Sequence, residues 1–216
     1  MKKVAVIGAG PSGITAIKNF IDEGFDVTAF ERCDGVGGNW RFNDPSGHSS
    51  VFETTHIISS KYTSFYEDYP LPDDASDYPS HKELLSYFDG YAEHFDIKKN
   101  IKFGTEVLSC KQLPNGRWLL KYKHLEGNDE ITLEFDALVV CNGHHHVPRY
   151  PQYKGEFSGE YIHSHDYKRA APFENKRVLV IGGGNSACDV AVETSRISQE
   201  TSLSWRRGYH LVPKFM

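Results

Sequence analysis

Two short glycine-rich segments, at 8–13 and 182–187, each follow a run of apolar residues and precede a helical pattern. Val4–Ile7 is rich in β-branched residues and stops at Gly8, after which apolar residues recur at helical spacing. A second apolar run then ends at Phe30. Strand, glycine turn, helix and strand in this order predict a βαβ unit whose parallel strands are buried on both faces. The chain is therefore expected to fold as an α/β protein with a Rossmann-like core.

The chain between the two glycine segments predicts further elements around this core. Residues 101–135 have the pattern of short strands with a turn at Pro114–Gly116, which predicts an antiparallel β-meander inserted into the parallel core. Residues 41–80 show little periodicity and predict a long irregular segment. Ser80 and Glu83 have the spacing of a capping box, which predicts the start of a helix.

Composition excludes several classes of protein. The 216 residues carry 24 Lys and Arg against 29 Asp and Glu, and no basic run offers a surface for a phosphate backbone, so we expect no nucleic-acid partner. The apolar run Val4–Ile7 is too short for a signal peptide or a membrane span. The four cysteines are scattered, which fits a reducing cytoplasm and predicts neither a metal cage nor a dithiol centre.

The first glycine segment has the residues that a dinucleotide diphosphate requires. Gly8 allows the tight turn, Gly10 lets the main chain approach the diphosphate, and Gly13 allows the helix to pack closely on the strand. Glu31 closes the second strand about 20 residues later, where its carboxylate can accept hydrogen bonds from ribose hydroxyls and would repel a 2′-phosphate. The segment is expected to bind FAD or NAD rather than NADP, the alternative being a glycine turn without a ligand.

The residues after Glu31 favour a flavin. Gly37–Trp40 resembles the Gly-Gly-x-Trp segment that follows the ribose-binding acid in flavoprotein monooxygenases, although a flexible loop with a core tryptophan would have the same composition. A further apolar strand ends at Cys141–Gly143, where the backbone can also approach a ligand. The residues expected to bind FAD are Gly8, Gly10, Pro11, Ser12, Gly13, Glu31, Arg32, Gly38, Asn39, Trp40 and Gly143.

The second glycine segment predicts a second dinucleotide. Gly182, Gly184 and Ala187 occupy the three positions that require small residues. No acid closes the following strand, and Arg206 and Arg207 follow it instead. Because a guanidinium can pair bidentately with a 2′-phosphate, NADPH is favoured over NADH; the alternative is that both arginines are solvated at the surface.

A linker fingerprint lies between the two glycine segments. Its positions are Phe157, Gly159, His163 and Tyr167. They match the Phe-x-Gly-x-x-x-His-x-x-x-Tyr/Phe pattern of the flavin-containing monooxygenases, and the chain resembles that family over essentially its whole length. Baeyer–Villiger relatives end the pattern in Trp-Pro, whereas Lys168 follows the tyrosine here, which favours the branch that oxygenates nitrogen and sulfur.

This resemblance implies an enzyme that holds FAD in a discontinuous domain with an NADP domain inserted in it. NADPH reduces the FAD, and O₂ then forms a C4a-hydroperoxyflavin that transfers one oxygen atom to an amine nitrogen or a sulfur of a small substrate. Carried over, Asn185 and Ser186 contact the NADP phosphates and Arg206 contacts the 2′-phosphate. His163 couples the two domains rather than acting as an acid–base catalyst; without the resemblance, a structural histidine is as good an interpretation.

One residue departs from the family pattern. The family places an asparagine beside the flavin three residues before a lysine, and Ile58 stands at that position before Lys61. Isoleucine donates no hydrogen bond, although Ser59 or Ser60 could substitute near the flavin. The triplet His144–His146 predicts no metal site, because neighbouring side chains of an extended segment point to opposite faces and no cysteine or carboxylate cluster is near.

Several interpretations stay open on the sequence alone. We expect an FAD-binding domain over 1–168, lacking its C-terminal return, and the beginning of an NADP-binding domain over 169–216. An uncoupled NADPH oxidase or flavin reductase is the rival enzyme, and a non-catalytic FAD-binding fragment is the rival from another class. The identity of the substrate and the formation of a homodimer are left open.

Overall fold

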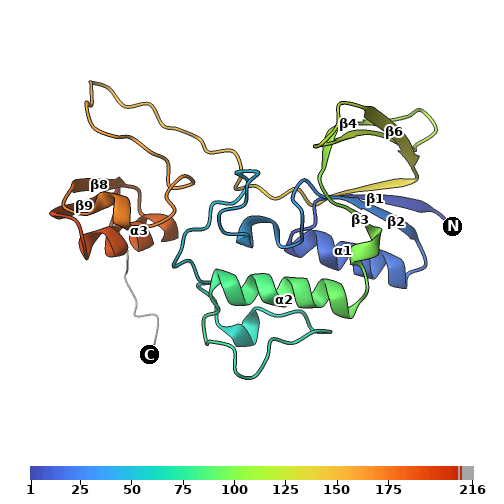
Figure 1. Cartoon of the computed structure of the whole chain (residues 1–216), viewed down its shortest axis with the longest axis horizontal. Coiled ribbons are helices and arrows are strands. Elements are labelled where there is room, and N and C mark those ends of the chain that lie inside the picture. Colours follow the sequence, from blue (N-terminus) through green and yellow to red (C-terminus); the bar gives the residue numbers. More distant parts are fainter. Residues whose placement is uncertain (209, 211–216) are drawn as a thin grey trace. The chain divides into compact units, whose positions relative to one another are not determined.

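The structure is a computed structural model that describes residues 1–208 and 210. The chain forms two compact units (Figure 1). The first unit comprises Met1–Val51 and Thr55–Val147, and the second comprises Phe52–Thr54 with the chain from Pro148 onward. This division by contacts falls earlier than residue 168, which was expected to separate the two cofactor domains; that assignment of domains to cofactors stays a prediction.

The first unit is built on a parallel sheet with the strand order β3-β2-β1-β7. Its strands are β1 (Lys3–Ile7), β2 (Asp26–Phe30), β3 (Ile101–Lys102) and β7 (Ala137–Val140). Helix α1 (Pro11–Asp22) connects β1 to β2, so the predicted strand–turn–helix–strand unit is confirmed.

Both faces of this sheet are buried, as the continuous apolar strands predicted. Val4 and Val6 of β1 lie in the core shared with α1 and with α2 (His81–His94). Ala5, which points to the other face, lies in a second core with three antiparallel strands. Figure 1 shows the helices on one side of the sheet and these strands on the other.

The antiparallel strands form the predicted meander. They are β4 (Thr105–Gln112), β5 (Trp118–His124) and β6 (Glu130–Phe135), in that order. Gly116 has a φ of 82° in the turn before β5, as the turn signal predicted. The expectation that the meander starts at Ile101 is wrong, because Ile101 and Lys102 pair in parallel with Ala29 and Phe30 of the central sheet.

Helix α2 begins at the predicted capping box. The hydroxyl of Ser80 accepts a hydrogen bond from the backbone N–H of Glu83, and the Glu83 carboxylate accepts one from the backbone N–H of Ser80. The segment before the helix is irregular, as expected. The short 3₁₀ helices of the described chain are η1 (Gly38–Trp40), η2 (Lys61–Thr63), η3 (Lys98–Asn100) and η4 (Ala171–Phe173).

The second unit contains the second βαβ pattern. Strand β8 (Arg177–Ile181) leads into α3 (Asn185–Ser195), and β9 (Glu200–Ser204) returns parallel to β8. Apolar side chains of β8 are open to solvent, since Leu179 is 61% exposed and Ile181 is 51% exposed. Within the described residues, every helix is too short or too polar to cross a lipid bilayer.

Candidate functional site

The first glycine segment forms a tight turn at the carboxyl end of β1. Gly8 has a φ of 97°, and its N–H donates to the carbonyl of Phe30 at 2.8 Å. A Cβ atom on Gly13 would lie 2.0 Å from the carbonyl oxygen of Gly8. Only glycine therefore lets α1 start this close to β1. The close helix–strand packing expected of Gly13 is present.

The start of α1 leaves space where a diphosphate is expected. Gly10 is the N-cap and supplies no side-chain cap, and Pro11 follows in the first turn. A Cβ atom on Gly10 would meet no atom nearer than Cα of Gly38, at 3.6 Å. The main chain at Gly10 is thus open to a ligand, and the positive end of the helix dipole lies there.

Glu31 is buried and braces the glycine turn. One carboxylate oxygen accepts a hydrogen bond from the N–H of Ala9 at 2.6 Å, and the other accepts one from the N–H of Cys33 at 2.8 Å. The sequence pattern predicts a ribose ligand for this carboxylate but gives no sign of these two hydrogen bonds. A carboxylate has about four acceptor positions, so two are left for ribose hydroxyls. Arg32, the next predicted residue, is exposed.

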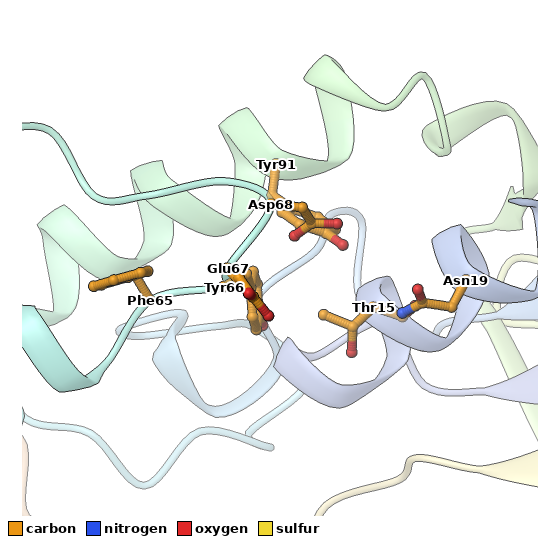
Figure 2. Close-up of a pocket in the computed structure, with 7 residues that line it drawn as sticks. All are labelled: Thr15, Asn19, Phe65, Tyr66, Glu67, Asp68 and Tyr91. Carbon is orange, nitrogen blue, oxygen red and sulfur yellow. The ribbon is translucent and has the colours of Figure 1, made fainter.

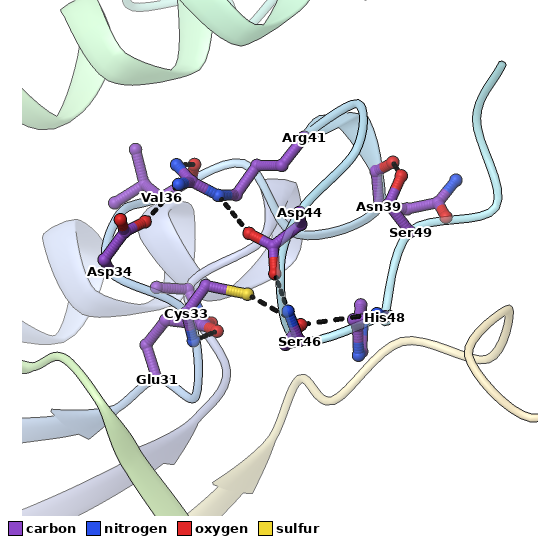
Figure 3. Close-up of polar contacts among 11 residues, drawn as sticks. Glu31, Cys33, Asp34, Val36, Asn39, Arg41, Asp44, Ser46, His48 and Ser49 are labelled. Atoms are coloured by element: carbon purple, nitrogen blue, oxygen red, sulfur yellow. Dashed lines mark hydrogen bonds and ion pairs between the residues drawn. The ribbon is translucent and has the colours of Figure 1, made fainter. Parts of the chain in front are cut away.

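The Gly-Gly-x-Trp segment is held by a side chain that sequence reasoning did not select (Figure 3). Arg41 donates to Asp44 at 2.9 Å, forms an ion pair with Asp34, and donates to the carbonyl of Val36 at 3.3 Å. The Asp44 side chain is 2% exposed. Burial opposes its ionisation, but hydrogen bonds from Ser46 and Arg41 lower the pKa of Asp44 to about 2. Arg41 therefore fixes the backbone around Gly38–Trp40, the residues that are predicted to bind FAD.

The last part of this segment is tied to the loop that follows. Ser49 donates to the carbonyl of Asn39 at 2.6 Å. The side-chain oxygen of Asn39 accepts hydrogen bonds from the N–H and the hydroxyl of Ser50, both at 2.9 Å. Asn39 and Trp40 lie in η1, which Gly38 enters with a φ of 52°. No periodicity in the sequence pointed to Ser49 or Ser50.

The residues expected near the flavin ring lie on an exposed loop. Ile58 is 67% exposed. The hydroxyl of Ser59 is 2.7 Å from that of Ser64, and Ser60 caps η2 by accepting a hydrogen bond from Tyr62. Both serine side chains thus serve local structure, and a role beside the flavin stays a prediction.

The segment after β7 contains the histidine triplet. Gly143 has a φ of 70° and is exposed, so its backbone is accessible. His146 stacks on His48 with ring centroids 4.7 Å apart. Burial, followed by the nearby His146, lowers the pKa of His48. In the described part of the chain, no group of three or more His, Cys, Asp or Glu side chains is arranged to hold a metal ion.

The second glycine segment repeats the arrangement of the first. Gly182 has a φ of 142°, and its N–H donates to the carbonyl of Ser204 at 2.9 Å. Gly184 is the N-cap of α3 without a side-chain cap, and a Cβ atom there would meet nothing within 4 Å. Asn185 and Ser186 form the exposed first turn. Backbone and helix dipole are therefore again available to an anion.

The two arginines expected to bind a 2′-phosphate follow the end of β9. Arg206 and Arg207 are both exposed. Because β8 and β9 are parallel neighbours, these arginines and the second glycine segment follow the carboxyl edge of the same sheet. The structure thus brings all the predicted NADP residues to one edge.

The linker fingerprint has partners within the second unit. The ring of Phe157 lies over Gly159, where a Cβ atom would be 2.5 Å from the phenyl ring. The Nδ1 atom of His163 accepts a hydrogen bond from the N–H of His165 at 3.0 Å. Tyr167 is 2% exposed and donates to Glu193 of α3 at 2.8 Å. The Phe157 ring therefore leaves no room for a side chain at position 159. Tyr167, at the end of the pattern, is held to α3 by its hydrogen bond.

A hollow of about 510 Å³ lies between α1, α2 and the loop at 65–68 (Figure 2). None of the residues predicted to bind a cofactor lines it. Tyr66, on its wall, donates to the carbonyl of Pro11 at 2.9 Å. The hydroxyl of Tyr91 is buried there without a hydrogen-bond partner among the described residues. Thr15, which also lines the hollow, donates to the carbonyls of Pro11 and Ser12, so the hollow is linked to the first glycine segment through Tyr66 and Thr15.

Comparisons with known proteins agree with this geometry. A family model described as flavin-binding monooxygenase-like matches residues 1–216. Flavin-containing monooxygenase 2 of Homo sapiens is 42% identical over 217 residues, which cover 96% of this chain and 40% of that protein. Dimethylaniline monooxygenase (N-oxide-forming) 2 of Oryctolagus cuniculus is 41% identical with the same coverage. The chain thus spans about 40% of the length of these curated relatives.

Solved structures share the fold. The S-allyl-L-cysteine S-oxygenase from Allium sativum is similar with a TM-score of 0.89 at 28% identity, covering 98% of this chain and 53% of that chain. The cyclohexanone monooxygenase from Rhodococcus sp. Phi1 bound to NADP⁺ is similar with a TM-score of 0.75 at 26% identity, covering 98% of this chain and 39% of that chain. With a family match over its whole length and this fold, the chain belongs to the flavin-binding monooxygenase-like family.

Proposed function

We propose that this chain is the part of an FAD- and NADPH-dependent monooxygenase that holds both dinucleotides. The enzyme transfers one oxygen atom from O₂ to an amine nitrogen or a sulfur of a small substrate. The observation that carries the proposal is the pair of uncapped helix starts at Gly10 and Gly184, each following a parallel strand and each open to a ligand.

The first site fits FAD. A side chain on Gly10 would occupy the open space beside Gly38, so glycine is required where the diphosphate would lie. Glu31 is fixed by two backbone hydrogen bonds and keeps acceptor positions for a ribose. Arg41 holds the following loop in place. In this family the flavin, when bound, supplies the redox and oxygen chemistry, and these residues bind and orient it.

The second site fits NADPH. The start of α3 offers backbone N–H groups to a diphosphate, and Arg206 and Arg207 supply positive charge at the same sheet edge. A similar structure, the cyclohexanone monooxygenase from Rhodococcus sp. Phi1, is described as bound to NADP⁺. This supports the assignment of the nicotinamide cofactor.

The substrate class rests on the names of similar proteins and on the linker. One curated relative is named N-oxide-forming, and one similar structure is an S-oxygenase. Lys168 follows the fingerprint tyrosine where Baeyer–Villiger relatives have Trp-Pro. A soft nucleophile, nitrogen or sulfur, is therefore the proposed oxygen acceptor.

The four free cysteines support the proposal of a cytoplasmic location.

An NADPH oxidase that releases peroxide is the second candidate. Ile58 cannot donate a hydrogen bond, and the neighbouring Ser59 and Ser60 are engaged in local hydrogen bonds. Without a hydrogen-bond donor beside the flavin, uncoupled oxidation is favoured, in which NADPH is consumed and peroxide is released without oxygenated product. The third candidate is a protein that binds FAD but does not catalyse a reaction.

The absorption spectrum of the purified chain distinguishes these candidates. We expect a yellow protein whose flavin band bleaches on anaerobic addition of NADPH. Peroxide and oxygenated product are then measured per NADPH consumed, with trimethylamine and a dialkyl sulfide as substrates. Product in excess of peroxide supports the monooxygenase, and peroxide alone supports the oxidase. A yellow protein that NADPH does not bleach leaves only FAD binding, and a colourless one that takes up no added FAD overturns the proposal.

A further inference from the structure

The side chain of Tyr167 is a buried junction in the second unit. It is 2% exposed. Its ring packs edge-on against Phe52, with centroids 5.4 Å apart, and lies tilted against Phe173, with centroids 5.6 Å apart. Its hydroxyl donates to Oε2 of Glu193 at 2.8 Å. One side chain therefore joins Phe52, which is distant in the sequence, to η4 and to α3.

The hydrogen bond to Glu193 holds the last turns of α3. The helix begins at Asn185, in the second glycine segment, and a helix of this length is about 16 Å long. Because a helix is stiff over that distance, a shift of its last turn tilts its first turn. The orientation of the N–H groups offered at the first turn therefore depends on the anchor at Glu193.

The charges around Glu193 make the hydroxyl of Tyr167 important. Asp189 on the same helix and Glu53 on the neighbouring segment oppose the ionised carboxylate, whereas Arg196 and the Tyr167 hydroxyl favour it. Burial has the largest effect and raises the pKa of Glu193. Removing the hydroxyl takes away a donor that the ionised carboxylate uses, and a partly buried carboxylate without that donor is costly.

The same junction holds the segment at 52–54. Phe52 is buried against the Tyr167 ring, and the N–H of Glu53 donates to the carbonyl of Lys168 at 2.9 Å. The chain continues from Thr54 directly into the loop with Ile58. Tyr167 thus contacts both α3 and the segment at 52–54, which leads in the sequence to the loop with Ile58.

We propose that Tyr167 and Glu193 are positioning residues for the nicotinamide dinucleotide, and that their hydrogen bond sets the helix start that binds the NADP diphosphate. The inference rests on the proposed NADP site and goes beyond it, because neither residue is expected to contact the cofactor. The fingerprint tyrosine then differs from a phenylalanine at the same position by this one hydrogen bond.

NADP⁺ binding to the purified full chain, measured by titration calorimetry with FAD present, tests the proposal. Tyr167→Phe keeps the ring and removes the hydroxyl, so we expect NADP⁺ affinity to fall about tenfold at pH 8. Glu193→Gln alone keeps an oxygen that accepts the Tyr167 hydrogen bond, so its NADP⁺ affinity should stay within about threefold of wild type. Adding it to Tyr167→Phe should cause no further loss, because the first change has already removed the hydrogen bond.

Tyr161→Phe is the matched control. It is the same change in the same linker, but that hydroxyl is on an exposed side chain and donates to the carbonyl of Pro151 at 3.3 Å. We expect NADP⁺ affinity to stay at the wild-type value. Glu193→Ala removes the acceptor without the tyrosine change, and it should weaken NADP⁺ binding as much as Tyr167→Phe does.

The outcomes separate the inference from the proposed function. If wild type binds NADP⁺ and Tyr167→Phe binds it equally well, the inference is overturned and the proposed function is left intact. The inference is also overturned if Glu193→Gln alone loses as much affinity as Glu193→Ala, or if it causes a further loss when added to Tyr167→Phe, because the two side chains then do not act through their shared hydrogen bond. Wild type that fails to bind NADP⁺ overturns both.

Discussion

At Gly13, one missing methyl group decides whether α1 can start where it does. A Cβ atom there would lie 2.0 Å from a backbone oxygen of Gly8, and backbone cannot move aside as a flexible side chain can. We expect Gly13→Ala to cost about 3 kcal/mol of folding free energy and to abolish FAD binding. Urea unfolding measures the first effect and flavin retention the second. Gly127→Ala is the control, since a Cβ atom on Gly127 meets nothing within 4 Å; equal stability of the two variants would contradict the steric argument.

The hydroxyl groups of Tyr91 and Tyr87 give a second prediction for single residues. Tyr91 is fully buried, and its hydroxyl has no hydrogen-bond partner among the described residues. A buried polar group without a partner costs free energy, so Tyr91→Phe should raise the free energy of unfolding by about 1 kcal/mol. Tyr87 differs, because its hydroxyl donates to the backbone carbonyl of Tyr69 at 2.6 Å and accepts from the backbone N–H of Tyr66 at 2.7 Å. Tyr87→Phe should lower stability by about 1 kcal/mol in the same urea titration. A lower free energy of unfolding in both variants would show that the Tyr91 hydroxyl does have a hydrogen-bond partner.

At the scale of elements, the capping box makes the stability of α2 depend on pH. Burial opposes ionisation of Glu83, but hydrogen bonds from the backbone of Ser76 and of Ser80 lower its pKa from 4.5 to about 2. The carboxylate therefore stabilises the folded state above pH 4.5, and this contribution is lost as the pH falls from 4.5 toward 2. Glu83→Gln should lower the free energy of unfolding by about 1 kcal/mol at pH 7.

The same pair of proteins checks the sign of this effect. Unfolding of wild type and Glu83→Gln is followed by circular dichroism at pH 7 and at pH 3. The difference between them should be smaller at pH 3, where the wild-type advantage is partly titrated away. A difference that grows on acidification would mean that Glu83 does not act as an ionised cap.

At the scale of the whole chain, each unit has a tryptophan reporter. Trp40 and Trp118 belong to the first unit and Trp205 to the second. In Trp205→Phe, tryptophan emission follows the first unit alone. If FAD binds at the first glycine segment, FAD at about 100 times its Kd should stabilise that unit by about 2.7 kcal/mol, seen as a rise in its thermal midpoint. NADP⁺ alone should leave this midpoint unchanged; a shift with NADP⁺ and none with FAD would reverse the assignment of cofactors to loops.

Spacing in the sequence is enough to predict the local features. The strand–turn–helix units, the capping box at Ser80 and the turn at Gly116 all followed from spacing, because backbone sterics and hydrogen bonds between near neighbours set them. The family also followed from the sequence, since its motifs are short and lie in a fixed order. These features need no knowledge of which distant segments meet.

Contacts between distant residues, in contrast, depend on how the whole chain packs. The tertiary structure placed Ile101 beside Ala29 in the parallel sheet rather than in the meander. It also joined Tyr167 to Glu193 and gave Glu31 two backbone donors. Such contacts depend on how the whole chain closes around its core, and a long loop costs nearly the same free energy to close over a wide range of lengths. Local pattern therefore carries no signal for the distant partner of a residue, which only the packed fold selects.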